Sequence, residues 1–394
     1  MTIHRQTGLP PPGVVMVETG GWGGLGHYAH CLCEALAKRG MPVTLATHRH
    51  RHALRFIQKR YALASCFIGD GFASDWRRLI SILHRRRPRI VHFQSLLAPR
   101  RDWVVFWLAR FFMRNTSFVI TAHNILPHER RPLDRTAYRL LYRAAAAIIV
   151  HSEASLNALN RLVRLPHGSI RAVIPHGHYG TIAAGEGLGR SEALRILNLD
   201  NHRYLLFFGA IRPYKGLDNL LRAVAGIRDW PRDLKLLIAG HPFMRSEQHR
   251  IEALARELAV SGRALFRFRY FPEEEIPALF RIADLVVLPY RRIDQSGVLM
   301  AALAAGRAVL ATPVGGFPEV VGPEIGFLSK TTSADDIRAA LLEALAARER
   351  WPKMGERAAM AAELQFGWEE IAARTEELYR RLVFVGPRTG AHNG

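Results

Sequence analysis

The chain contains little cysteine, few acidic residues for its length and no long apolar run. Its three cysteines, Cys31, Cys33 and Cys66, are too few for a disulfide framework or a four-ligand zinc site. No stretch of about 18 apolar residues occurs, so we expect no membrane-spanning helix. The polar, proline-rich start of the sequence does not resemble a signal peptide. These features favour a reducing compartment, and we predict a cytoplasmic protein.

Basic residues outnumber acidic residues, and the excess lies mainly in the first half of the chain. The 394 residues include 55 Lys and Arg against 34 Asp and Glu, which gives a formal net charge of +21. Residues 1–200 hold 28 of the basic residues and 11 of the acidic residues. Such a charge favours anionic partners, either nucleic acid or an anionic membrane. No helix-turn-helix, zinc or aromatic stacking module accompanies it, so we expect no nucleic acid.

Predicted strands and helices alternate along both halves of the chain. This order specifies a mostly parallel, doubly wound α/β sheet in each half, and the length suits two domains. We predict domains at residues 1–180 and 203–366, joined by a polar, glycine-containing linker at residues 181–202. The predicted strands cover residues 14–18, 43–47, 90–94, 117–122 and 147–152, then residues 204–209, 234–240, 264–269, 285–290 and 308–313.

The most informative motif is FFGAIRPYKGLDNLL, at residues 207–221. Its apolar start predicts a buried parallel strand, and Arg212 and Lys215 follow in the turn before a helix that begins near Leu217. Two cations then lie at the carboxyl end of a strand, beside helix N–H groups that favour anions. Ligands of open α/β sheets bind at this place. The motif therefore predicts capture of a pyrophosphate, and a surface loop with solvated cations is the alternative.

A glycine-rich turn joins the first predicted strand to the first predicted helix. Its sequence GGWGGLG contains Gly21-x-Gly23-x-x-Gly26, which is typical of dinucleotide-binding sites. Those sites hold a ribose with an acidic residue at the end of the second strand, where this chain has Thr47 and His48. We therefore favour a turn whose N–H groups approach a phosphate or sugar. A nicotinamide site and a merely flexible turn are the alternatives.

A histidine follows another predicted strand, in the sequence TAHNILPHE. His123 comes directly after residues 117–122, so we expect it to face a cleft between the two domains. An imidazole at such a place can bind a sugar hydroxyl or meet a developing charge near neutral pH. A structural histidine is the alternative.

In their order and spacing these motifs resemble the nucleotide-sugar glycosyltransferases of the GT-B fold, specifically glycosyltransferase family 4. The resemblance covers residues 14 to about 383, and it rests on the Gly23-Gly24 turn, His123, the Arg212 and Lys215 motif, and ALAAGRAVLATPVGGFPEVV. It implies two Rossmann-like domains facing across a cleft, with residues 367–394 forming a helix that returns to the first domain and a tail. It also implies a hexosyltransferase that uses a nucleotide sugar and needs no metal or other cofactor.

The resemblance further implies roles for individual residues. The glycine turn and His123 approach the phosphate and sugar of the donor, Arg212 and Lys215 hold its diphosphate, and the second domain binds the nucleoside. The implied donor-binding set is Gly23, Gly24, Arg212, Lys215, Pro289, Tyr290, Gln295, Ser296, Gly297, Val298 and Glu319.

One position departs from the family pattern. Family members carry two glutamates eight positions apart, and alignment on Gly306 puts the second of them at Ala301. Alanine cannot accept hydrogen bonds from a ribose diol, so nucleoside binding must differ locally. The change also raises a rival function, a nucleotide-binding protein with a degenerate catalytic site.

The stereochemical outcome stays open, because HNxxPHE, HGHY and IRPYKG also resemble inverting mannosyltransferases that use GDP-mannose and polyprenyl-diphosphate glycolipids. In a retaining reaction a leaving phosphate oxygen takes the proton of the acceptor, and Arg212 and Lys215 neutralise the leaving group. In an inverting reaction a base lies on the opposite face, and Glu129 and His123 are the candidates. We favour retention, with a polysaccharide or a lipid-linked glycan as acceptor.

The stretch APRRDWVVFWLARFFMRN combines arginines with aromatic residues. Its apolar part is too short to span a bilayer but can lie in the interface. We predict that Trp103, Trp107 and Phe111 contact the anionic inner face of the cytoplasmic membrane, where each arginine adds about 1 kcal/mol. A helix that covers a sheet, with charged ends reaching solvent, is the alternative.

Overall fold

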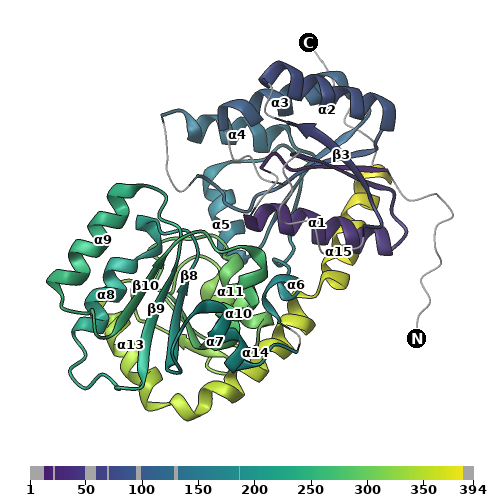
Figure 1. Ribbon diagram of the computed structural model, residues 1–394. Coiled ribbons are helices and arrows are strands. Elements are labelled where there is room, and N and C mark those ends of the chain that lie inside the picture. Colours follow the sequence, from purple (N-terminus) through teal and green to yellow (C-terminus); the bar gives the residue numbers. More distant parts are fainter. Residues whose placement is uncertain are drawn as a thin grey trace. The chain divides into compact units, whose positions relative to one another are not determined.

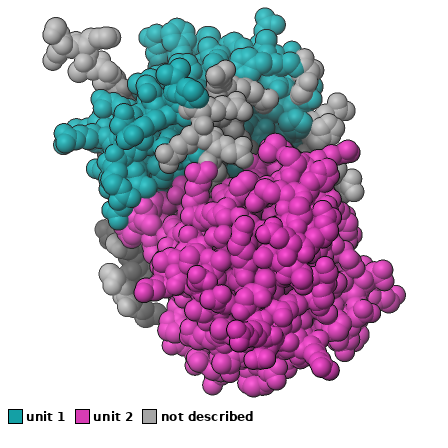
Figure 2. Space-filling view, turned by 90° about the vertical axis from the view of Figure 1, so that its left-hand side faces the viewer, with its two compact units in different colours: residues 1–150, 156–174, 368–394 teal, residues 151–155, 175–367 magenta. Residues whose placement is uncertain are grey.

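A computed structural model describes residues 13–20, 23–48, 59–68, 71–94, 99–127, 132–185 and 187–384. The chain divides into two compact units, which Figure 2 distinguishes by colour. Unit 1 comprises residues 1–150, 156–174 and 368–394, and unit 2 comprises residues 151–155 and 175–367. Among the described helices, none is both long and apolar enough to cross a bilayer.

Unit 1 contains a seven-stranded parallel sheet in the order β3-β2-β1-β4-β5-β6-β7. Val14 of β1 lies opposite Val43 of β2 on one side and Ile90 of β4 on the other. The strands are β1 (Val14–Val17), β2 (Val43–His48), β3 (Ala62–Phe67), β4 (Ile90–Gln94), β5 (Ser117–Thr121), β6 (Ala147–Val150) and β7 (Ile170–Val173). The helices are α1 (Gly23–Lys38), α2 (Phe72–Arg86), α3 (Pro99–Phe112), α4 (Asp134–Ala144), α5 (Glu153–Leu162) and α15 (Trp368–Phe384).

Helices cover both faces of this sheet, and strands such as β1 and β6 are therefore buried along their whole length. Helices α2, α3, α4 and α5 supply one apolar cluster, and α1 and α15 supply the other, which includes Tyr28 and Tyr379. Arg39, directly after α1, pairs with Glu369 and Glu376 of α15, at 2.7 Å in both cases. The last helix is therefore an integral part of unit 1.

Unit 2 contains a six-stranded parallel sheet in the order β10-β9-β8-β11-β12-β13. Figure 1 shows β8, β9 and β10 lying side by side in this sheet. The strands are β8 (Arg203–Phe208), β9 (Leu234–Gly240), β10 (Ala264–Phe268), β11 (Ala283–Leu288), β12 (Ala308–Ala311) and β13 (Gly326–Leu328). The helices are α6 (Gly180–Ala183), α7 (Arg190–Leu197), α8 (Leu217–Ala225), α9 (Arg245–Glu257), α10 (Ile276–Ile282), α11 (Gly297–Ala304), α12 (Phe317–Val320), α13 (Ala334–Ala346) and α14 (Trp351–Phe366), with short 3-10 turns η2 (Pro213–Lys215), η3 (Glu273–Glu275) and η4 (Arg348–Arg350).

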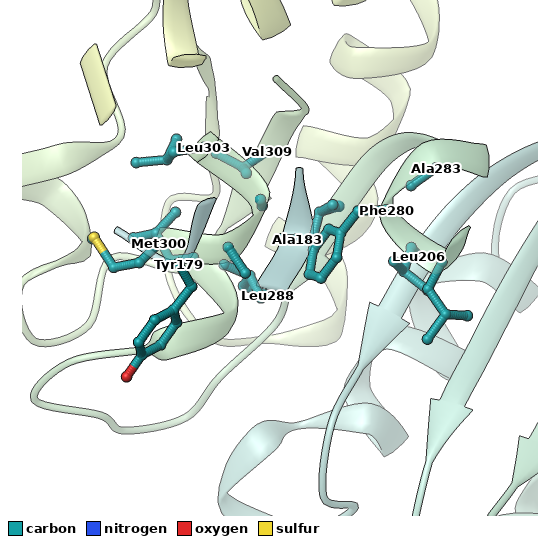
Figure 3. Packing of buried hydrophobic residues seen from close by; sticks show 14 of the residues in the cluster. Tyr179, Ala183, Leu206, Phe280, Ala283, Leu288, Met300, Leu303 and Val309 are labelled. Carbon is teal, nitrogen blue, oxygen red and sulfur yellow. The ribbon is translucent and has the colours of Figure 1, made fainter. Parts of the chain in front are cut away.

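A large apolar core packs on one face of the sheet of unit 2. Figure 3 shows side chains from this core, among them Tyr179, Phe280 and Met300 with Leu206 of β8 and Leu288 of β11. The predicted α/β class and the doubly wound order are confirmed in both units, because each sheet is wholly parallel and extends both ways from its first strand.

Four segments differ from the sequence prediction. The predicted strands do not include β3, β7 or β13. Strands β7 and β13 have only four and three residues, and β3 is a partly exposed edge strand without a continuous apolar run. Residues 181–202, for which we predicted a linker, contain α7 and belong to unit 2. That helix buries Ala193, Leu194 and Leu197, whose spacing places them on one helical face.

Candidate functional site

The predicted phosphate-binding motif lies where the strand order of unit 2 reverses. Strands β8 and β11 are neighbours, and the chain continues outward from them in opposite directions. In such sheets the loops after these two strands diverge and leave a crevice at their carboxyl ends. Gly209 directly follows β8, and Pro289 and Tyr290 directly follow β11. The helix after the motif begins at Leu217, as predicted.

Lys215 reaches back over the end of β8. Gly209 has a φ of +106°, and a Cβ atom added there would lie 2.8 Å from the Lys215 Nζ and 3.6 Å from a methyl carbon of Val298. A side chain at position 209 would therefore displace the amine, and the absence of one lets the cation occupy the strand end. The structure thus brings together three elements of the predicted site: the end of β8, Lys215 and Val298.

The Lys215 ammonium group is buried, and no residue that the structure describes supplies it with an anionic partner. The residue is 7% exposed, and within the described part of the chain no carboxylate lies within 4.0 Å of its Nζ. Its Nζ lies 5.2 Å from the centre of the Tyr290 ring. Burial, together with the charge of Arg212, lowers the pKa of Lys215 from its ordinary value. A buried cation of this kind gains free energy when an anion binds beside it.

Arg212 begins the turn that carries Lys215. Its guanidinium carbon lies 3.7 Å from the centre of the Phe243 ring, which orients the planar group by a cation–π contact. Ile211 forms a parallel bridge with Pro242, so the chain on both sides of this contact is held to the end of β9. The two cations of the motif therefore project from a fixed backbone.

Gly216 closes the same turn against the loop after β11. Its φ is +67°, and an added Cβ atom would overlap the carbonyl oxygen of Pro289. The N–H of Arg291 donates to the carbonyl of Tyr214 at 2.8 Å. Only glycine satisfies both the backbone angle and the close approach at position 216.

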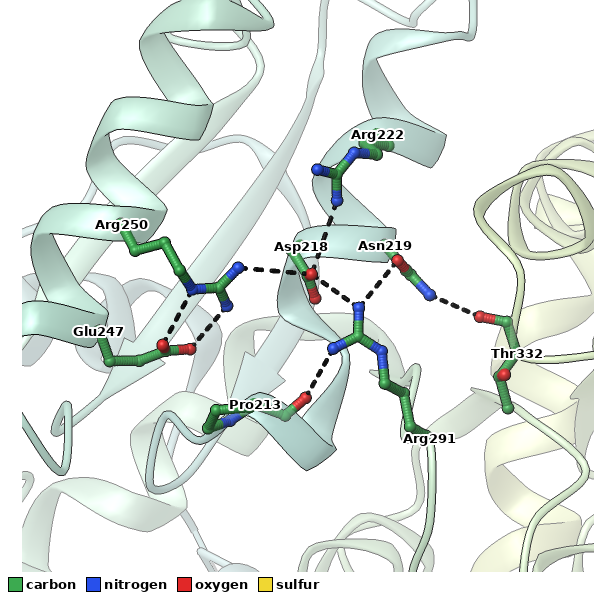
Figure 4. Close-up of polar contacts among 8 residues, drawn as sticks. All are labelled: Pro213, Asp218, Asn219, Arg222, Glu247, Arg250, Arg291 and Thr332. Atoms are coloured by element: carbon green, nitrogen blue, oxygen red, sulfur yellow. Dashed lines mark hydrogen bonds and ion pairs between the residues drawn. The ribbon is translucent and has the colours of Figure 1, made fainter.

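Figure 4 shows a network of hydrogen bonds and ion pairs that joins the Arg212–Lys215 turn to Asp218 in α8. The Arg291 guanidinium donates to the carbonyl of Pro213 at 3.1 Å and to the carboxylate of Asp218 at 2.6 Å. Arg250 and Arg222 each approach the same carboxylate at 3.5 Å. Burial alone raises the pKa of Asp218, but the hydrogen bond and charge of Arg291, with the charge of Arg250, outweigh burial and hold that pKa below its ordinary value.

The segment that follows β11 begins helix α11. Ser296 is the N-cap of this helix, and its hydroxyl accepts the N–H of Leu299 at 3.4 Å. A Cβ atom added at Gly297 would lie 2.6 Å from the Tyr179 ring, so only glycine fits there. Gln295 accepts the N–H of Ser296 and donates to the His151 carbonyl, at 3.3 and 3.5 Å.

Ala301 is buried in the apolar core of unit 2, in the middle of α11. The methyl group thus belongs to the packing of the helix and offers no polar atom to a ligand. At this position, therefore, the glutamate of the family pattern is replaced by an alanine whose methyl group packs in the core.

Glu319 binds the start of helix α5. Its two carboxylate oxygens accept the N–H groups of Glu153 and Ala154, at 2.9 and 2.8 Å. These groups belong to the first two residues of α5, which the division of the chain assigns to unit 2 together with Glu319. They have no partner within the helix, so the carboxylate satisfies them and also interacts favourably with the helix dipole. The implied donor-binding residue therefore holds a helix N-terminus in this structure.

The glycine turn of unit 1 lies at the corresponding strand reversal, after β1. Gly23 opens α1 with a φ of +68°, and among the described residues, apart from its chain neighbours and the backbone of its own helix, none has an atom within 4 Å of an added Cβ atom. The Glu18 carboxylate, 1% exposed, accepts the N–H of Gly20 at 2.7 Å and the hydroxyl of Thr47 at 2.9 Å. The sequence prediction treated Glu18 only as a strand residue, and a buried acid at the end of a strand was the signal that it missed.

His123 lies just past β5 and is oriented by two neighbours. Its Nε2 lies 3.1 Å from Oε1 of Gln94, and its ring meets that of Tyr28 edge to face at 4.6 Å. The Gln94 oxygen can only accept, so Nε2 is the donor in this contact, and in the neutral ring Nδ1 would then be the acceptor. Gln94 ends β4 and is a second residue that the sequence prediction missed.

A buried network ties this pair to the last helix. His92 Nε2 lies 2.7 Å from the Thr121 hydroxyl and 3.3 Å from the Gln94 amide nitrogen, and its Nδ1 lies 2.5 Å from the hydroxyl of Tyr379 in α15. Burial lowers the pKa of His92 to about 3, so the ring stays neutral at physiological pH. Strand β4 and α15 together therefore fix the orientation of Gln94.

Two other expectations for unit 1 have different outcomes. Glu129, the candidate base, lies outside the described residues.

On α3, Trp103 and Trp107 pack against the apolar core of unit 1, whereas Phe111 is 64% exposed and Phe112 is 42% exposed. The two tryptophans are partly buried against this core and Phe111 is exposed, and the membrane contact predicted for the three side chains stays a prediction.

Comparisons with known proteins agree with this geometry. The model for Glycosyltransferase Family 4 matches residues 22–178, and the model for Glycosyl transferases group 1 matches residues 190–360. The D-inositol 3-phosphate glycosyltransferase of Corynebacterium aurimucosum is 30% identical over 394 residues, covering 93% of each chain. The GDP-mannose:glycolipid 4-beta-D-mannosyltransferase of Xanthomonas campestris is 30% identical over 264 residues, covering 63% of this chain and 69% of that protein.

A solved structure extends the comparison to the fold. Anabaena HepE, solved in complex with UDP and glucose, superimposes with a TM-score of 0.77 at 18% identity, covering 94% of this chain and 100% of that chain. The predicted GT-B fold is thereby confirmed. Together with the motif after β8, the family models and the Corynebacterium relative show that the chain is a glycosyltransferase of family 4, group 1.

Proposed function

We propose that the protein transfers a hexose from GDP-mannose or a UDP-hexose to a polysaccharide or a lipid-linked glycan. The Xanthomonas relative is named for GDP-mannose and a glycolipid, and HepE was solved with UDP and glucose. These names support the two donor classes and an acceptor that carries a glycan or lipid.

One observation carries the assignment of the donor site: Lys215 is a buried cation at the carboxyl end of β8, with no carboxylate within 4.0 Å in the described part of the chain. Arg212 lies three residues before it, on the same fixed turn. A diphosphate supplies the two adjacent negative charges that such a pair binds best. The pair therefore serves the donor's leaving group.

The two cations lower the barrier by stabilising charge that forms during transfer. As the bond between the anomeric carbon and the β-phosphate oxygen breaks, negative charge grows on that phosphate, and fixed cations stabilise it more than they stabilise the intact donor. In the retaining reaction that we favour, the acceptor oxygen bonds to the anomeric carbon on the face that the phosphate leaves. The acceptor proton then passes to the departing phosphate oxygen.

Unit 1 offers the groups for the sugar and the acceptor. We assign His123 to a sugar or acceptor hydroxyl, since Gln94 fixes its orientation and its acceptor nitrogen. In the alternative, inverting reaction, that acceptor nitrogen is a base for the acceptor hydroxyl. Product stereochemistry distinguishes the two routes, because only inversion converts an α-linked donor into a β-linked product.

The proposed reaction needs no metal, because Arg212 and Lys215 supply the positive charge that the leaving diphosphate requires. Activity should therefore persist in EDTA at a concentration that removes divalent cations. A rate that EDTA abolishes and magnesium restores would contradict this part of the proposal.

We further propose that unit 1 contacts anionic membrane at the inner face of the cytoplasmic membrane, through Phe111 and Phe112. Both side chains are exposed at the end of α3, and Arg114 lies beside Phe111, with its guanidinium carbon 5.9 Å from the ring centre. Exposed aromatic residues next to a cation suit a lipid interface. The variant with Phe111→Ser and Phe112→Ser should remain folded and should sediment less with anionic liposomes, and unchanged sedimentation would refute the contact.

The direct test of function is transfer of a hexose from each of two nucleotide-sugar donors to a lipid-linked glycan. GDP-mannose and UDP-glucose are incubated with the protein and a polyprenyl-diphosphate glycan, and transfer is measured by mass spectrometry of the acceptor. Transfer with one donor supports the proposal and names the donor class. Tight binding of UDP or GDP with no transfer to any acceptor and no hydrolysis would favour the rival, a degenerate nucleotide-binding protein, which Ala301 raises.

A further inference from the structure

Unit 2 contains a cationic cavity at the end of its sheet opposite to the candidate donor site. The cavity has a volume of about 470 Å³, and its lining includes Arg190, Arg203, Arg307, Arg348 and Trp351. Arg203 is the first residue of β8 and Arg307 directly precedes β12, so the cavity lies at the amino ends of the strands. The candidate donor site lies at the carboxyl ends, which a six-residue strand separates by roughly 20 Å.

Two of the four arginines lie beside carboxylates that also line the cavity. Arg190 lies 3.2 Å from the carboxylate of Asp284 and donates to the carbonyls of Ile282 and His202, at 2.7 Å each. Arg203 lies 3.8 Å from Asp233. These pairs shape the wall of the cavity and leave its net charge to the other two arginines.

Arg307 lacks a partner of this kind. Its guanidinium donates to the carbonyls of Ala305 and Ala283, at 3.1 and 3.2 Å, and no carboxylate within the described ranges lies within 4.0 Å of it. Burial, with the charges of Arg281 and Arg190, lowers its pKa, and Asp284 compensates only in part. An anion in the cavity would supply the charge that the protein does not.

The fourth arginine and an aromatic wall complete the cavity. Arg348 pairs only with its exposed neighbour Glu349 among the described residues, at 3.5 Å, and such a pair contributes little. Trp351 is 3% exposed, and its indole N–H donates to the carbonyl of Ala344 at 3.1 Å, so the ring is fixed as an apolar surface. Guanidinium groups beside a rigid apolar wall suit a ligand with a phosphate at one end and an organic group at the other.

We propose that this cavity binds a small organic phosphate, with Arg307 and Arg348 on the phosphate and Trp351 beside the organic group. The site is separate from the proposed donor site. Sugar transfer from the donor does not require the organic phosphate that we propose for the cavity. The proposal stands or falls independently of the sugar-transfer reaction, because no residue is shared between the two sites.

The test uses the full chain carrying Lys215→Met, so that the donor site cannot take up the probe. Glucose 1-phosphate and inorganic phosphate are titrated by calorimetry into this parent and into the same chain with Arg307→Gln and Arg348→Gln. The matched control carries Arg195→Gln and Arg256→Gln, two exposed arginines of unit 2 outside the cavity, and so has the same net charge. We expect glucose 1-phosphate to bind the parent and the control equally and the double variant about tenfold more weakly or worse.

Three results would overturn the proposal: no binding to the parent, equal binding to the double variant and the control, or inorganic phosphate binding as tightly as glucose 1-phosphate. The third would reduce the cavity to a simple anion site. If the change at the half-buried Arg307 prevents folding, as thermal unfolding would show, Arg348→Gln alone replaces the double variant, with Arg195→Gln as its control. The Arg348 side chain is 45% exposed, and its loss should weaken glucose 1-phosphate binding about threefold or more.

Discussion

Arg291→Met tests whether the network beneath the Arg212–Lys215 turn prepares it for a diphosphate. Methionine keeps much of the side-chain bulk and removes the guanidinium group, which donates to Asp218, Asn219 and the Pro213 carbonyl, at 2.6, 3.1 and 3.1 Å. The bond to the Asp218 carboxylate is the strongest of these, since the Asp218 side chain is only 8% exposed. The variant therefore loses the contact that joins the buried carboxylate to the turn.

The expected cost follows from these contacts. A hydrogen bond to a charged group contributes about 1.5–3 kcal/mol and a neutral one about 0.5–1.5 kcal/mol. Arg291 is 36% exposed and Asp218 retains Arg250 and Arg222, so water and these cations offset part of the loss. We expect the free energy of unfolding to fall by about 2 kcal/mol, which lowers the Tm of a unit of this size by about 4–8 °C.

The affinity of Arg291→Met for UDP or GDP should also fall, because the same contacts hold the turn in place. A loosened turn must be ordered when the ligand binds, at a cost of about 0.5–1.5 kcal/mol for each ordered side chain. The Kd for UDP or GDP should then rise by roughly three- to tenfold, measured by calorimetry at a temperature where the variant is folded.

Arg222→Met is the matched control. Arg222 approaches the same Asp218 carboxylate, but at 3.5 Å, with 47% of its side chain exposed. No hydrogen bond links its side chain to the turn within the described part of the chain. Its loss should cost less than about 1 kcal/mol and leave the Kd unchanged within about twofold. Equal nucleotide affinity in the two variants would refute the idea that Arg291 prepares the turn.

Three further predictions test single contacts. Gly216→Ala should lower the free energy of unfolding by about 2 kcal/mol or more, measured by denaturant titration, because of its positive φ and the overlap with Pro289, and a smaller loss would contradict so close an approach of the two loops. The pKa of Asp218 is lowered in the folded state, so its stabilisation should be complete above about pH 5 and should disappear as the pH falls below the ordinary carboxyl pKa of about 3.9. The difference in Tm between the parent and Asp218→Asn should therefore decrease over that range, and a constant difference would contradict this prediction. Gln94→Met should lower kcat about tenfold at little change in the KM of the donor, and Gln94→Glu, which keeps an acceptor for His123, should recover part of the rate, whereas equal rates would leave Gln94 without a positioning role.

Local pattern was sufficient to predict the strand ends that carry the chemistry. The apolar run before Gly209 forms β8, the helix after the motif begins at Leu217, and Lys215 lies between them at the strand reversal. These features depend on residues close together in sequence, where periodicity and turn chemistry determine the outcome. The family resemblance, resting on the same motifs, is confirmed by the family models.

The contacts that support these motifs could not be predicted, because they join residues far apart in the chain. Arg291 reaches Asp218 across 73 positions, and Tyr379 reaches His92 across 287. Glu319 stood in a motif that implied donor binding, yet its carboxylate binds the N–H groups at the start of α5. On α3, aromatic residues and arginines alternate too closely for the sequence to distinguish the half-buried Trp107 face from the exposed Phe111 face.

The most direct test of the central claim, that Lys215 receives the diphosphate of a nucleotide sugar, is a titration of UDP and GDP into the parent protein and Lys215→Met. Thermal unfolding of both proteins is followed with and without nucleotide. We predict that the variant alone unfolds no earlier than the parent, because it no longer buries an uncompensated cation. At about 100 times the Kd, one nucleotide should stabilise the parent by about 2.7 kcal/mol and the variant hardly at all. Equal stabilisation of the two proteins would contradict the assignment.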